Sequence, residues 1–272
     1  MADAGEGLSA GAVANPRLWR LGMELDMDGA TLAVAAASSV GEEEMLVRRI
    51  GLASGIAPLR ALEDAVYDNP MLLADFDRTT ILLRTPRFSV VPSELAEDAD
   101  AVADAAALLW TSADECPRLF ISPVAGTDAS VLTACDADVA AFIGRTFADA
   151  KVEHALVPLM AYFAAKAPRC GDSAKVFAVV SSVGADLIVF DENSRLRGAT
   201  SYVCASPDDM SYYAAAMAQV CGVASPELSF YVAGEAAVRD SVMDSLRRFA
   251  PNVMPWVMPA GQDVPFSLLE VV

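Results

Sequence analysis

The chain has 272 residues, of which 54% are hydrophobic, and a mean hydropathy of +0.38, which is enough apolar material for two modest domains with a core in each. A formal net charge of -18 and a pI near 4.3 argue against broad contact with nucleic-acid phosphates or anionic lipid head groups, because both need Lys and Arg. The charge favours a basic protein partner instead.

The ends and the cysteines indicate a cytoplasmic protein. Residues 1–15 carry two acids and no basic residue before an apolar stretch, so a flexible leader is expected rather than a secretory signal. The apolar run at 155–165 is too short to span a bilayer and contains Pro158, so no membrane segment is predicted. The five widely spaced cysteines form no CxxC pair, which predicts free thiols and no metal site.

The first half of the chain is predicted to cover residues 16–170. It opens with a hairpin at the Asp28-Gly29 turn. Alternating and continuous apolar runs predict its strands, and apolar residues at helical spacing predict its helices. The strands are expected at 18–26, 30–37, 45–52, 79–84, 88–91, 118–122 and 130–134, and the helices at 57–67, 98–110, 136–147 and 154–167.

The second half is predicted to cover residues 171–272, after the break at residues 168–172. Its strands are expected at 176–181, 186–190, 196–205, 228–232 and 253–258, and its helices at 207–220 and 236–249. Ser206 is the expected N-cap of the first helix, with Pro207 at its first position.

The two halves share one order of elements, namely three strands, a helix and a strand. Strands joined both by hairpins and by helices predict a mixed sheet flanked by helices. The sequence therefore predicts an α/β fold with a duplicated topology.

Five segments stand out together: the hairpin around Asp28-Gly29, the Tyr67–Leu72 stretch, Val91–Leu95, the helix at His154 and the unit Val176–Ala205. In these segments the chain resembles the DUF3822 family of bacterial proteins. The resemblance implies two ribonuclease-H-like halves in an actin-like ATPase fold, with a nucleotide cleft between them. It implies phosphate turns that carry an acid and glycines, and an adenosine turn with glycines.

The candidate residues of a vestigial nucleotide cleft are Asp26, Asp28, Gly29, Ser182, Gly184 and Gly234. Each has an ordinary interpretation as well: Asp28-Gly29 fits a plain type I′ turn, and a glycine at a strand end serves close packing. Ser182 stands where an active ATPase would have an aspartate, and a serine cannot supply charge to a bound Mg²⁺.

Other candidates have simpler interpretations. The single histidine, His154, is expected to cap or pack at the start of its helix. Asp75 and Asp77 are interpreted as solvated turn acids, although alternate carboxylates can form a dyad. Trp110, Trp256 and the Tyr212-Tyr213 pair are expected in the core or an interface. The apolar tail at 264–272 is expected to dock on its own sheet or on a second subunit.

We therefore expect a non-catalytic binding or scaffold protein with no required cofactor and an unidentified protein partner. The alternative is a diverged ATP- and Mg²⁺-dependent phosphotransferase or ATPase that uses Asp26 or Asp28 in the cleft between the halves. A homodimer or filament subunit is the third class.

Overall fold

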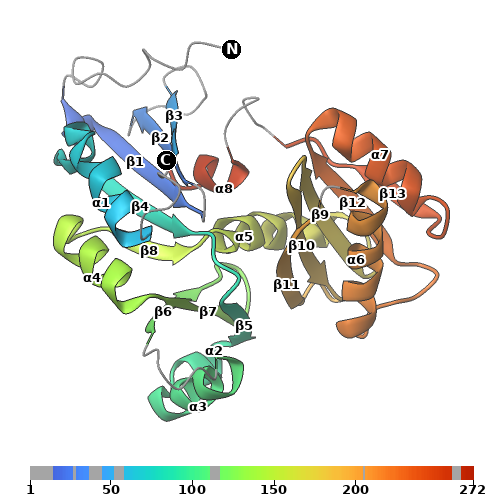
Figure 1. The fold of residues 1–272 in the computed structure, drawn as a ribbon. Helices are drawn as coiled ribbons and strands as arrows, with labels where there is room; N and C mark the ends of the chain where they lie inside the picture. The colour runs from blue at the N-terminus through green and yellow to red at the C-terminus, as the bar shows by residue number, and fades with distance from the viewer. Residues whose placement is uncertain are drawn as a thin grey trace.

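A computed structural model gives the fold of the chain (Figure 1). The structure describes residues 15–26, 29–36, 45–51, 58–110, 117–204, 206–258 and 265–272. Within these ranges the strands form two five-stranded sheets and one three-stranded sheet. The expected leader at 1–15 lies outside the described residues except for Asn15.

The first sheet has the strand order β3-β2-β1-β4-β8. Its strands are β1 (Trp19–Leu25), β2 (Gly29–Ala36), β3 (Met45–Gly51), β4 (Arg78–Leu83) and β8 (Lys151–His154). The first three strands are antiparallel, and β4 and β8 continue the sheet in parallel. The sheet is therefore mixed, as the combination of hairpins and helical connections predicts.

The second sheet repeats this order as β11-β10-β9-β12-β13. Its strands are β9 (Lys175–Ser181), β10 (Gly184–Phe190), β11 (Leu196–Val203), β12 (Ser229–Gly234) and β13 (Asn252–Pro255). Here too β9, β10 and β11 are antiparallel to their neighbours, and β12 and β13 are parallel to β9. The expected duplication of topology is confirmed at the level of pairing and direction.

A third sheet, which we call the insertion sheet, lies in the sequence between β4 and β8 and has the order β5-β7-β6. It consists of β5 (Phe88–Pro92), β6 (Arg118–Pro123) and β7 (Ala129–Cys135), and it carries the helices α2 (Ser93–Ala96) and α3 (Ala99–Leu109). Asp98 caps α3, since its carboxylate accepts from the N–H groups of Asp100 and Ala101. These strands were expected, but their separate sheet was not.

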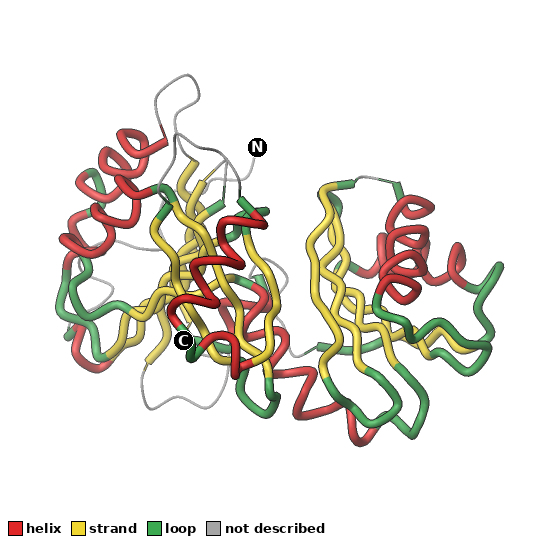
Figure 2. Tube along the Cα trace, turned by 90° about the horizontal axis from the view of Figure 1, so that it is seen from below, coloured by secondary structure: helices red, strands yellow, loops and turns green. Residues whose placement is uncertain are grey.

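The remaining helices cover the two large sheets and fill the space between them (Figures 1 and 2). Apolar residues of α1 (Pro58–Tyr67) and α4 (Ala137–Thr146) pack on one face of the first sheet, and those of α6 (Pro207–Val220) and α7 (Ala236–Leu246) on one face of the second. Single 3-10 turns are η1 (Pro16–Leu18), η3 (Pro70–Leu73) and η4 (Ala167–Arg169).

The helix α5 (Leu156–Lys166) is the central packing element. Its apolar residues form one cluster with residues of the second sheet and of the insertion sheet, including Phe163, Phe177 and Val131, each with no exposed surface. A helix that is apolar on nearly all sides is expected between layers, and α5 confirms this.

The C-terminal helix α8 (Phe266–Leu269) returns to the first sheet, so the tail docks on its own chain as one of the two expectations had it. Leu268 is fully buried in a cluster with Ala33 of β2 and Leu82 of β4. The chain end packs directly over Gly22 of β1, which leaves room for it because glycine has no Cβ. A Cβ there would lie 2.7 Å from Val272 Cγ1. Residue 264 of the predicted tail lies outside the described residues.

Two local predictions were wrong. His154 ends strand β8 rather than beginning a helix, because residues 151–154 pair with β4 before α5 starts at Leu156. The helix α7 ends at Leu246 instead of residue 249, which leaves Phe249 56% exposed beyond it. Ser206 is the N-cap residue of α6 and Pro207 follows it, as predicted, although the Ser206 side chain makes no capping bond.

Candidate functional site

The glycines predicted for phosphate contacts are crowded by backbone. A Cβ on Gly29 would lie 2.6 Å from the carbonyl oxygen of Ile50, on the neighbouring strand β3. A Cβ on Gly184 would overlap the carbonyl of Tyr202 on β11, and one on Gly234 would overlap that of Val180 on β9. Gly234 also has a φ of +114°, which side chains rarely adopt. Close strand packing is therefore sufficient to explain all three glycines.

The two hairpin turns differ in what they offer a ligand. Ser182 is exposed in the β9–β10 turn, and the nearby Val183 N–H donates to Ser181 Oγ at 3.4 Å. Asp28 of the first turn lies outside the described residues. The second turn supplies a hydroxyl and no carboxylate.

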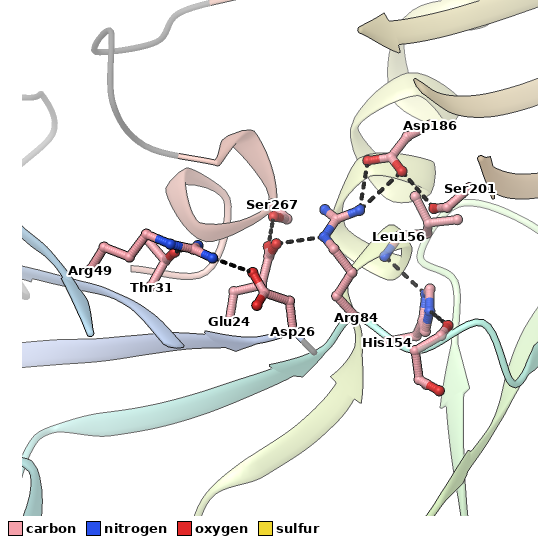
Figure 3. A network of polar contacts seen from close by, with 11 residues as sticks. Glu24, Asp26, Thr31, Arg49, Arg84, His154, Leu156, Asp186, Ser201 and Ser267 are labelled. Carbon is pink, nitrogen blue, oxygen red and sulfur yellow. Dashed lines mark hydrogen bonds and ion pairs between the residues drawn. The ribbon is translucent and has the colours of Figure 1, made fainter. Parts of the chain in front are cut away.

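Asp26 is neutralised by an arginine of its own sheet. Arg49 Nη2 of β3 donates to Asp26 Oδ2 at 3.0 Å, and Arg49 Nη1 donates to Thr31 Oγ1 at 2.9 Å (Figure 3). A carboxylate with a guanidinium partner has less negative charge available for a hydrated metal ion.

An arginine joins the two large sheets beside these turns (Figure 3). Arg84 follows β4, and its Nε donates to Glu24 Oε1 of β1 at 2.6 Å. Its Nη1 donates to both carboxylate oxygens of Asp186 of β10, at 3.0 and 3.1 Å. Glu24 is two positions before Asp26, and Asp186 is two positions after Gly184, so this bridge lies next to both predicted phosphate turns.

Two hydroxyls complete the bridge. Ser201 Oγ of β11 donates to Asp186 Oδ1 at 2.5 Å, and Ser267 Oγ of α8 donates to Glu24 Oε2. Burial by itself would lower the pKa of Arg84, but Asp186 and Glu24 outweigh it and raise that pKa above its ordinary value. The arginine therefore stays charged, and we call the set Glu24, Arg84, Asp186, Ser201 and Ser267 the clasp.

His154 packs next to the clasp as a neutral side chain. Leu156 N–H donates to Nδ1 at 3.2 Å, so Nε2 carries the proton and donates to the Thr85 carbonyl at 3.0 Å. Its ring stacks on Phe88, with centroids 4.0 Å apart. Burial, aided by the charge of Arg84, lowers the pKa of His154 to about 4. His154 thus caps the start of α5 from a strand end.

The other candidates make structural contacts. Asp75 and Asp77 form ion pairs with Arg17 and Arg20, and the Arg17–Asp75 pair is largely exposed. Trp256 belongs to an aromatic cluster with Phe163, Phe177 and Tyr231. Among the residues that the structure describes, no three His, Cys, Asp or Glu side chains group as a metal site, and four cysteines are free. Within the same residues, no helix is long and apolar enough to cross a membrane.

The clasp was not predicted from the sequence. A weak signal existed, since Glu24 and Asp186 each interrupt an apolar strand and Arg84 directly follows another. Charged residues are rarely buried unless they are paired. Nothing local to these three residues indicates that they meet, because their partners lie on different strands.

The fold agrees with known structures. A protein of unknown function with an actin-like ATPase fold from Bacteroides thetaiotaomicron is 17% identical, with a TM-score of 0.77, and the match covers 94% of this chain and 97% of that one. The PilM–PilN type IV pilus biogenesis complex contains a chain that is 11% identical, with a TM-score of 0.52, over 94% of this chain and 95% of that one. These similarities show that the chain shares the fold of these two proteins.

No curated protein matches the sequence significantly. The model of the family described as protein of unknown function (DUF3822) matches residues 23–253. The clasp residues Glu24, Arg84, Asp186 and Ser201 fall inside this range, whereas Ser267 falls outside it. With most of its length matched by that model, and with duplicated sheets in an actin-like arrangement, the chain belongs to the DUF3822 family.

Proposed function

We propose that this protein is a non-catalytic binding or scaffold module that has kept an actin-like architecture without a working nucleotide site. The observation that carries the proposal is the bridge of Arg84 between Glu24 and Asp186. An ATPase at this position needs carboxylates for a hydrated Mg²⁺ and backbone N–H groups for phosphates. Here Glu24 and Asp186 are both bound to the guanidinium of Arg84.

The residues present do not fit ATP and Mg²⁺. Asp26 is paired with Arg49, Ser182 stands in place of an aspartate, and the three glycines are explained by close strand packing. Removing the carboxylate near a transferring phosphoryl group removes a main electrostatic contribution to catalysis.

The partner and the location belong to the same proposal. A net charge of -18 supports a basic protein partner, and it disfavours nucleic acid and anionic membranes. A cytoplasmic location is proposed on the five widely spaced cysteines, which form no CxxC pair. The division into halves at 16–170 and 171–272 is proposed on the repeated strand order. A homodimer is the alternative assembly.

Thermal unfolding with and without ligand tests the proposal. Millimolar ATP with Mg²⁺, and ADP, are expected to leave the melting temperature unchanged. A nucleotide present at 100 times its dissociation constant would stabilise the native state by about 2.7 kcal/mol. A shift that disappears in Asp26→Ala or Asp28→Ala would instead support the phosphotransferase alternative and overturn the proposal.

A further inference from the structure

The outer strands of the two large sheets are protected to different degrees. On the first sheet, β3 carries Arg48 and Arg49, and β8 is only four residues long. On the second sheet, β13 is four residues long and ends in Pro255. Short strands, charges and proline are the usual means by which proteins block unwanted pairing at sheet edges.

Strand β11 has little of this protection. It has eight residues, with Arg197 as its one charged residue and no proline. Among the described residues it pairs only with β10, and Figure 1 shows it at the edge of the second sheet. The insertion strand β5 comes near it without pairing with it.

The register shows which backbone groups face outward. Val203 pairs with Gly184 of β10, and the next residue, Cys204, donates its N–H to Val183 at 3.1 Å. Because hydrogen bonds alternate along an antiparallel strand, the N–H and C=O groups of Ala199, Ser201 and Val203 point to the open edge. These groups can pair with an added strand.

Apolar side chains lie beside this edge on both faces of β11. On the face toward α6, Tyr202 stacks on Tyr213 with centroids 4.1 Å apart, and Met217 packs beside Gly198. Both α6 residues are half-buried. At the end of the strand, Val203 is 97% exposed. An added strand can place alternate side chains against these apolar groups.

The charge of the chain indicates the chemistry of the occupant. A net charge of -18 opposes pairing of β11 with the same strand of a second copy, whereas it attracts a basic segment. Asp209 at the start of α6 is exposed and adds negative charge near the end of this edge, whereas Asp208 beside it is paired with Arg248.

We propose that the open edge of β11, along Ala199–Val203, binds an extended basic segment of a partner protein as an additional strand. This inference rests on the proposed binding role and specifies a surface for it. Backbone hydrogen bonds supply the affinity, and the apolar side chains on either face select alternate residues of the segment.

A synthetic peptide tests the edge. An eight-residue labelled peptide of alternating valine and lysine, matched to the eight residues of β11, is titrated with the full chain by fluorescence anisotropy. The wild-type chain is expected to bind it. Val203→Pro removes one outward N–H without changing the charge, and it should weaken binding by about three- to tenfold. The control Val203→Thr keeps the N–H and should bind as wild type.

A second peptide makes the test independent of how the variant folds. The same peptide with every backbone amide N-methylated keeps its side chains and charge but has no N–H to donate on either edge, and the wild-type chain should not bind it. Equal binding of both peptides would show adsorption by charge alone and overturn the proposal, as would no binding of either. A dimer that dissociates in Val203→Pro, seen by sedimentation, would replace the partner with a second copy. The peptide experiments do not depend on the thermal-unfolding experiment with nucleotide. The β11 proposal and the proposal of a non-catalytic role can therefore be overturned separately.

Discussion

Arg84 and Asp186 form an ion pair between the two large sheets, with Arg84 Nη1 3.0 Å from Asp186 Oδ1, although 102 positions separate them in sequence. The same guanidinium holds Glu24 of the first sheet through Nε. One side chain thus connects the two sheets. Because the N–H groups of a guanidinium lie in one rigid plane, this connection sets the relative directions of the two carboxylates as well as balancing their charge.

Removing the arginine is expected to destabilise the protein. Arg84→Met leaves Glu24 and Asp186 without their cation, and breaking a buried pair on one side costs about 3 kcal/mol. Urea denaturation measures the loss. Arg17→Ala, at the exposed pair with Asp75, is the control and should cost less than about 1 kcal/mol. An Arg84→Met protein as stable as the control would mean that the clasp does not hold the sheets.

Gly234 is expected to tolerate no side chain. Its φ of +114° and the nearby carbonyl of Val180 mean that Gly234→Ala must distort the end of β12, at a cost above about 1 kcal/mol. Gly144 of helix α4 is the matched control, since a Cβ there meets nothing within 4 Å. Gly144→Ala should stabilise by about 0.5–1 kcal/mol. Chemical denaturation of both variants gives the comparison, and a stabilising Gly234→Ala would contradict the crowded geometry.

His154 should make stability fall in mild acid. Its folded pKa of about 4 lies below the ordinary value of 6.5, so the unfolded state takes up a proton first. The stability that neutral His154 contributes to the folded state is fully present above pH 6.5. It is lost as the pH falls toward 4, and the total loss is about 3 kcal/mol. Urea unfolding of wild type and His154→Gln at several pH values measures this.

The difference in stability between these two proteins should shrink from pH 7 to pH 4.5. A difference that stays constant would show that His154 does not remain neutral in the folded state. A titration of the ring by NMR gives the same pKa directly and separates it from the carboxylates, which titrate in the same range.

Ser267 is expected to couple the tail to the clasp. Ser267→Ala leaves Glu24 Oε2 without its buried hydroxyl donor, which should cost about 1–2 kcal/mol. Ser241→Ala, an exposed hydroxyl that bonds within α7, is the control and should have little effect. A double-mutant cycle with Asp186→Asn measures the coupling through Glu24 and Arg84. Strictly additive losses would show that the tail and the second sheet are independent.

Much of the local structure could be predicted from the residues. The Asp28-Gly29 and Ser182-Gly184 turns correctly separate paired strands, although Asp28 itself is outside the described residues. The helix α5 was misjudged at its start, because His154 can end a strand and cap a helix at once. The strand β8 was missed because four residues give too short a pattern to identify.

The sequence by itself determined the repeated order of elements, the acidic charge and the absence of an aspartate at the second turn, because these depend on residue type and on spacing along the chain. Only the tertiary structure decided that Glu24, Arg84 and Asp186 meet, that the three glycines are crowded by neighbouring strands, and that β11 has an open edge. Each of these depends on which strand lies beside which, and strand pairing is set by the burial of whole faces rather than by any local residue pattern.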